Sequence, residues 1–210
     1  MRITDAVKQP PAVGAAGPEA KESRLTLANL LTFARILLIP VFVLLFINPT
    51  PERSLAAAMV FVVAAVTDLL DGYIARRRGE ITRLGRLLDP IADKLLVLSG
   101  LILLVQFDRV IALVAILIIA REVAVTGIRA IAAADGVVLS SETIGKWKMA
   151  LQVVAVVLLI LDDGRGGLVP VSWNLHPLGT GLLYLALGLA LVSGGRILMS
   201  FWREVAIKKL

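Results

Sequence analysis

Residues 68–94 read DLLDGYIARRRGEITRLGRLLDPIADK, a stretch that joins the ends of two long apolar segments. The segments cover residues 55–76 and 84–106, and four aspartates fall within them or at their ends: Asp68, Asp71, Asp89 and Asp93. An ionised carboxylate in the middle of a membrane helix costs at least about 2.5–3.5 kcal/mol. We therefore expect these side chains to face the interior of a helix bundle, where a cation or a proton offsets their charge.

The spacing of acidic and small residues predicts that the two aspartate pairs share one space. One helix face, at positions i, i+3, i+4 and i+7, carries Asp68, Asp71, Gly72 and Ala75. One face of the next helix, at i, i+4 and i+8, carries Gly85, Asp89 and Asp93. Because a short connection joins the two helices, they are expected to be antiparallel neighbours with both pairs at the same end. The small residues on these faces leave room for close packing or for a ligand.

Four converging carboxylates repel one another, and hard divalent cations relieve that repulsion. Oxygen ligands favour Mg²⁺, Mn²⁺ or Ca²⁺ over Zn²⁺. A paired metal site suits substitution at phosphorus, because it neutralises the phosphates and clamps the attacking and leaving oxygens. For that chemistry we expect a two-metal site that contains Mg²⁺ or Mn²⁺. Two other interpretations are structural salt bridges with nearby arginines and a proton relay. The matched faces, with small residues between the acids, favour the metal site.

The rest of the chain predicts an all-α integral membrane protein. Of 210 residues, 58% are hydrophobic and 18% are charged, whereas soluble domains are about 45–50% apolar and about 25% charged. Six apolar segments of nearly membrane-spanning length cover residues 33–48, 55–76, 84–106, 109–132, 144–161 and 178–201. An amphipathic lead-in from Leu25 precedes the first of these six transmembrane helices. We expect residues 1–24 to be a disordered cytoplasmic tail and residues 25–205 to form one membrane domain.

The distribution of positive charge predicts the orientation. The net charge is +6, and five arginines gather around the connection after the second segment: Arg76, Arg77, Arg78, Arg83 and Arg86. With six crossings, the positive-inside rule places both termini and the connections at 77–83 and 133–143 on the cytoplasmic side of the cell membrane, together with the aspartates. Nucleic acid is not an expected partner, because basic and aromatic residues are not interleaved. The chain has no cysteine, which excludes disulfides, thiolate metal sites and a cysteine nucleophile.

Read together, these residues spell Asp68-x2-Asp71-Gly72-x2-Ala75-Arg76-x8-Gly85-x3-Asp89-x3-Asp93. This pattern resembles the signature of the CDP-alcohol phosphatidyltransferase family at all eight fixed positions. The resemblance implies that Asp68, Asp71 and Asp89 hold metals. It also implies that Asp93 completes the site and is the general base on the acceptor hydroxyl. The donor's nucleotide and diphosphate would lie against Asp68, Gly72, Ala75, Arg76 and Gly85. CDP-diacylglycerol would be the donor, CMP would leave, and the protein would be a homodimer among membrane lipids.

Three further segments resemble the branch of the family whose acceptor is glycerol 3-phosphate. They are Asn29-Leu-Leu-Thr32-x2-Arg35, residues 121–129 (REVAVTGIR) and Gly145-Lys146-Trp147-Lys148. A phosphorylated acceptor requires cations, and the candidates are Arg121, Arg129, Lys146, Lys148 and Arg196. For Arg121 the alternative is structural pairing with a carboxylate, and for Arg196, Lys146 and Lys148 it is anchoring at the interface. The side chains of Asn29, Thr32 and Arg35 either bind the donor headgroup or cap and anchor the first helix.

Two alternative functions remain open at this point. One is the same chemistry with another acceptor, either inositol phosphate or phosphatidylglycerol, as in a cardiolipin synthase. The other is a small cation or proton transporter that uses the aspartates as its pathway. Against the transporter, the chain lacks a clear internal repeat, and its aspartates gather at one membrane face.

Overall fold

The computed structural model describes residues 27–78, 83–136, 143–162 and 175–208, and these residues form six α-helices. The helices are α1 (Leu27–Phe46), α2 (Pro51–Arg78), α3 (Arg83–Gln106), α4 (Ala112–Ala134), α5 (Thr143–Leu161) and α6 (Leu175–Lys208). Each of the six apolar segments falls almost entirely within one of these helices, so the predicted all-α class is confirmed. The predicted tail, residues 1–24, lies outside the described residues.

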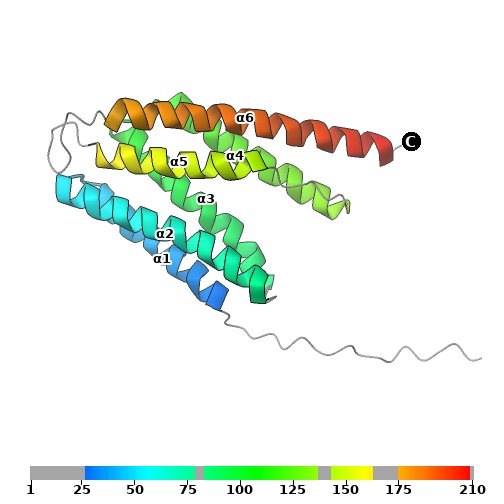
Figure 1. The fold of residues 1–210 in the computed structure, drawn as a ribbon, viewed down its shortest axis with the longest axis horizontal. Coiled ribbons are helices and arrows are strands. Elements are labelled where there is room, and N and C mark those ends of the chain that lie inside the picture. The colour runs from blue at the N-terminus through cyan, green and yellow to red at the C-terminus, as the bar shows by residue number, and fades with distance from the viewer. Residues whose placement is uncertain (1–26, 79–82, 137–142, 163–174, 209–210) are drawn as a thin grey trace, which may run out of the picture.

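The helices alternate in direction along the bundle (Figure 1). One side of the molecule carries the start of α1, the end of α2, the start of α3, the end of α4, the start of α5 and the end of α6 (Figure 1). Helix α1 packs on α2 and α3, α6 packs on α5 and α4, and α2 packs on α5. Two three-helix groups therefore meet, with α2 and α3 of one group against α4 and α5 of the other.

The first helix is longer than its apolar segment. The predicted lead-in and the segment at 33–48 form one continuous helix, α1, that begins at Leu27. Two polar residues near the start of this helix, Thr32 and Arg35, are 1% and 0% exposed. These polar side chains point into the protein, and the helix continues without a break across residue 33, where its apolar segment begins.

Aromatic residues fill the core at the end of the bundle away from the aspartates. The Phe42 ring centroid lies 5.4 Å from that of Phe61 in an edge-to-face arrangement, and Phe46 and Phe107 meet in the same way at 5.5 Å. Such pairs contribute about 0.5–1.5 kcal/mol beyond the area that they bury. These contacts tie α1 to α2 and to the end of α3.

Arg109 closes the end of α5 from a distant part of the chain. Its Nη1 donates hydrogen bonds to the carbonyl oxygens of Leu159 and Ile160, each at 2.9 Å. The last carbonyls of a helix have no partner within the helix and carry partial negative charge. The same guanidinium lies 5.4 Å from the centre of the Phe46 ring, a cation–π contact. Arg109 therefore joins α1, α5 and the α3–α4 connection.

One of the described helices contains a stretch long and apolar enough to cross a membrane by those two criteria alone, the 30-residue stretch Leu175–Glu204 of α6. Leu30–Phe46, Lys94–Gln106 and Trp147–Leu161 are shorter apolar stretches. The six helices have between 19 and 34 residues. At about 1.5 Å per residue, even the shortest is nearly as long as the roughly 30 Å hydrocarbon layer is thick.

Gly179 sets the distance between α5 and α6, and its replacement is expected to destabilise the protein. A Cβ at this position would lie 2.8 Å from Leu159 Cγ and 3.3 Å from the Ala155 carbonyl oxygen. We expect Gly179→Ala to lower the free energy of unfolding by about 1–3 kcal/mol through overpacking. The measurement is the melting temperature of the purified protein in detergent.

Gly181, on the same helix, provides the matched control. A Cβ there would meet no atom within 4 Å, and alanine is the better helix former by about 1 kcal/mol. Gly181→Ala should therefore leave the melting temperature unchanged or raise it. Equal melting temperatures for the two variants would contradict the close packing of α5 and α6 at Gly179.

Candidate functional site

The backbone places the two halves of the aspartate motif beside each other. Asp68 and Asp71 lie in the last three turns of α2, and Asp89 and Asp93 lie in the first three turns of α3. The two helices are in contact and antiparallel, so both pairs are at the same end of the bundle, as predicted. The side chains of residues 68–90 and of Asp93 lie outside the described residues. The roles predicted for the aspartates, Gly72, Ala75, Arg76 and Gly85 therefore stay predictions.

The chemistry of this donor set fits hard divalent cations. Four carboxylates supply oxygen ligands alone, which is what Mg²⁺ and Mn²⁺ prefer. Among the described side chains no group of three potential ligands was found, but the four aspartates are not among those side chains. The match to Mg²⁺ or Mn²⁺ is therefore one of residue type and helix position.

The residues predicted to contact the donor headgroup lie inside the bundle. Thr32 and Arg35 are almost completely buried and take part in interactions within the protein, whereas the side chain of Asn29 lies outside the described residues. Headgroup binding by these residues stays a prediction.

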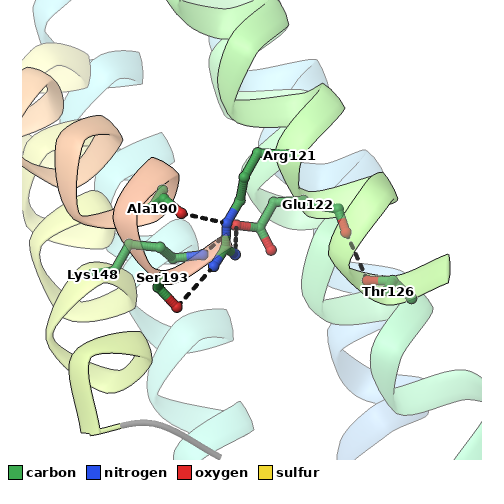
Figure 2. A network of polar contacts seen from close by, with 6 residues as sticks. All are labelled: Arg121, Glu122, Thr126, Lys148, Ala190 and Ser193. Atoms are coloured by element: carbon green, nitrogen blue, oxygen red, sulfur yellow. Dashed lines mark hydrogen bonds and ion pairs between the residues drawn. The ribbon is translucent and has the colours of Figure 1, made fainter. Parts of the chain in front are cut away.

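A buried ionic network joins α4, α5 and α6 (Figure 2). At its centre the Oε1 atom of Glu122 accepts a hydrogen bond from Arg121 Nη1 at 3.0 Å and another from Lys148 Nζ. Arg121 also donates through Nε to the Ala190 carbonyl oxygen at 2.8 Å and through Nη2 to Ser193 Oγ at 3.2 Å. Two of the predicted acceptor-binding cations, Arg121 and Lys148, are therefore brought together by one carboxylate.

The network is largely shielded from solvent. The side chains of Arg121, Lys148 and Glu122 are 10%, 8% and 23% exposed. Gly194 makes room for it, because a Cβ at that position would lie 3.3 Å from Arg121 Nε. Buried charges are tolerated when they are paired and hydrogen-bonded, and Glu122 meets that need for both cations.

Two residues of the network, Glu122 and Lys148, line a cavity of about 80 Å³ between α3, α4 and α5. Its polar walls are formed by Lys94, Glu122, Lys148 and Gln152, and the other walls are mostly apolar. Since one water takes about 30 Å³ of liquid, the cavity has room for a few waters or one small polar group. Lys94 follows Asp93 directly on α3, so one wall of the cavity adjoins the aspartate motif in the sequence.

The other predicted acceptor-binding residues are not part of this network. Arg129 on α4 and Arg196 on α6 are exposed and make no ion pair with the described residues. The side chain of Lys146 lies outside the described residues. The structure therefore brings together two of the five candidate cations.

Sequence reasoning missed Glu122 as the centre of the network and Ser193 and Gly194 as its support on α6. Glu122 gave a signal, because it is a carboxylate inside the apolar segment 109–132, where such residues mark functional positions. Ser193 and Gly194 gave none, since small residues are common along membrane helices.

The sequence of this chain is similar to those of a known protein family and of several named proteins. A sequence model of the CDP-alcohol phosphatidyltransferase family matches residues 25–203. A protein of Bacillus subtilis (strain 168), named CDP-diacylglycerol–glycerol-3-phosphate 3-phosphatidyltransferase, is 38% identical over 85% of this chain and 96% of its own length. A protein of the same name from Rickettsia typhi is 41% identical over 80% of this chain and 92% of its own length. A rice protein named cardiolipin synthase (CMP-forming) is 35% identical over 85% of this chain and 58% of its own length.

Proposed function

We propose, since the chain belongs to the CDP-alcohol phosphatidyltransferase family, that it transfers the phosphatidyl group of CDP-diacylglycerol to glycerol 3-phosphate, releasing CMP. The observation that carries the choice of acceptor is the agreement among relatives. Proteins named for glycerol 3-phosphate match this chain at 38% and 41% identity over nearly their full length. The buried cations Arg121 and Lys148 suit an acceptor that carries a phosphate.

In this proposal Asp93 accepts the proton of the acceptor hydroxyl. The acceptor oxygen then forms a bond to the phosphorus that bears the diacylglycerol. The bond from that phosphorus to the bridging oxygen breaks, and CMP leaves with the bond's electron pair. A positioned base of this kind contributes about 10²–10⁴-fold to the rate.

The donor diphosphate binds at the aspartate motif in this proposal. Mg²⁺ or Mn²⁺, held by Asp68, Asp71, Asp89 and Asp93, would supply neutralisation of the phosphate charges. Gly72, Ala75 and Gly85 leave space for the nucleotide, and Arg76 contacts the diphosphate. Arg121, Arg129, Lys146, Lys148 and Arg196 are the proposed acceptor-binding cations.

We further propose that all six helices cross the cell membrane, with the aspartates at the cytoplasmic side. The lengths of the helices and the many exposed apolar side chains, such as Leu37, Leu44 and Met199, support this arrangement. Residues 25–205 would form the membrane domain, and two copies would pair through these apolar faces. Residues 1–24 would be a cytoplasmic tail.

A second acceptor is favoured by one observation, the 35% identity to the rice protein named cardiolipin synthase (CMP-forming). In that alternative, phosphatidylglycerol replaces glycerol 3-phosphate. The relative covers this chain well, but the match spans only 58% of the rice protein. Glycerol 3-phosphate is therefore the preferred acceptor.

The test is CMP release from CDP-diacylglycerol by the protein purified in detergent. Glycerol 3-phosphate, phosphatidylglycerol and inositol phosphate are supplied in separate reactions with Mg²⁺ or Mn²⁺. We expect release with glycerol 3-phosphate alone. Release only with phosphatidylglycerol would favour the cardiolipin synthase alternative, and release with none would contradict the proposed activity.

A further inference from the structure

We propose that Glu122 is a positioning residue of the acceptor site, which holds Arg121 and Lys148 in place for the phosphate of glycerol 3-phosphate. This inference rests on the proposed function. The carboxylate of Glu122 lies between the two cations and binds both through one oxygen (Figure 2). It thereby fixes an arginine of α4 and a lysine of α5 relative to each other.

Both cations, Arg121 and Lys148, still have N–H donors for a ligand. A guanidinium has five N–H donors, and Arg121 uses three of them, on Glu122, Ala190 and Ser193. An ammonium has three, and Lys148 uses one, on Glu122. On each cation, two donors are therefore not used in hydrogen bonds to described residues. A phosphate has several acceptor oxygens, so it can bind to both cations while Glu122 still holds them.

Charge explains why a carboxylate is needed at this place. Without Glu122, two cations would lie close together in a largely buried site, and they would repel each other. A flexible lysine side chain would then move away towards solvent, because its charge is costly to bury alone. With Glu122 the site stays ordered and keeps a net positive charge, which a phosphate can neutralise.

The position of Glu122 and Lys148 also supports a role in ligand binding. Glu122 and Lys148 line the cavity between α3, α4 and α5, together with Lys94 of α3. Lys94 adjoins Asp93, the proposed base. A phosphate held by Lys148 would therefore keep the acceptor near the aspartate motif along α3.

The test is steady-state kinetics of Glu122→Gln, which keeps the shape of the side chain and removes its charge. We expect KM for glycerol 3-phosphate to rise about tenfold or more, since hydrogen bonds to charged groups are stronger than those between neutral groups. The value of kcat at saturation and KM for CDP-diacylglycerol should stay unchanged, which is the pattern expected when binding energy common to the ground state and the transition state is lost. A merely structural role would instead change both KM values or kcat.

A double-mutant cycle identifies the residue through which Glu122 acts. In a Lys148→Met background, Glu122→Gln should have a much smaller effect on KM for glycerol 3-phosphate than in the unaltered protein. Thr126→Val is the matched control, because it removes only the hydrogen bond from Thr126 Oγ1 to the Glu122 backbone carbonyl. This control should leave both KM values unchanged.

Glu122→Asp, which keeps the charge on a shorter side chain, is measured alongside and provides the test if Glu122→Gln does not fold. A selective rise in KM for glycerol 3-phosphate in the folded variant supports the inference. If the unaltered protein is active but the Glu122 variants keep the same KM, or bind glycerol 3-phosphate more tightly, the inference about Glu122 is wrong and the proposed function stands. An inactive unaltered protein would overturn the proposed function, and this inference with it.

Discussion

Replacing Asp93 with asparagine is expected to lower kcat for CMP release by about 10³-fold, within the 10²–10⁴-fold range of a positioned general base. Asparagine has nearly the same size as aspartate, but it cannot take a proton from the acceptor hydroxyl. Its amide also brings no negative charge to a metal ion, and this adds to the loss of the base. The measurement is CMP release with CDP-diacylglycerol, glycerol 3-phosphate and saturating Mg²⁺.

Asp108→Asn is the matched control for this variant. Asp108 is exposed, follows α3 at its far end and has a backbone φ of 56°. Asparagine accepts this left-handed conformation readily. The control should keep full activity and the same melting temperature. Full activity in folded Asp93→Asn would contradict the role proposed for Asp93.

Removing divalent cations is expected to abolish CMP release. With EDTA in excess, no divalent cation would balance the negative charges of the four carboxylates of α2 and α3 and of the donor diphosphate. We expect a loss of at least several kcal/mol of transition-state stabilisation, which corresponds to about 10³-fold or more in rate. Addition of Mg²⁺ or Mn²⁺ beyond the chelator should restore the activity.

A variant of the motif distinguishes a bound metal from a general effect of salt. Asp68→Asn should raise the Mg²⁺ concentration required for half-maximal activity, whereas Asp108→Asn should not change it. Undiminished activity in EDTA, or recovery with monovalent salt alone, would contradict the proposed metal site.

The number and order of the helices could be predicted from the sequence, but the ends of the helices could not. Runs of apolar residues mark where helices are buried in protein or lipid, whereas a helix can continue beyond its apolar part. Helix α6 begins at Leu175 and ends at Lys208, although the apolar segment covered only residues 178–201. Helix α1 begins at Leu27, six residues before its apolar segment, and Thr32 in this added part is buried.

The candidate site was predictable where its residues are close in sequence. The aspartates of α2 and α3 follow from spacing, because a short connection leaves few ways to arrange two neighbouring helices. The contact between Glu122 and Lys148 depends on how α4 and α5 are rotated about their axes, which the apolar pattern does not determine. The same limit applies to Arg109, which reaches the end of α5 some 50 residues further along the chain.

The most direct test of the central claim is the identity of the lipid product when two acceptors compete. The purified protein is given CDP-diacylglycerol, Mg²⁺ and equal concentrations of glycerol 3-phosphate and inositol phosphate, and the lipids are analysed by mass spectrometry. The account predicts phosphatidylglycerophosphate as the product, formed together with CMP. Phosphatidylinositol phosphate as the main product would contradict the proposed acceptor, and CMP without any new lipid would contradict transfer itself.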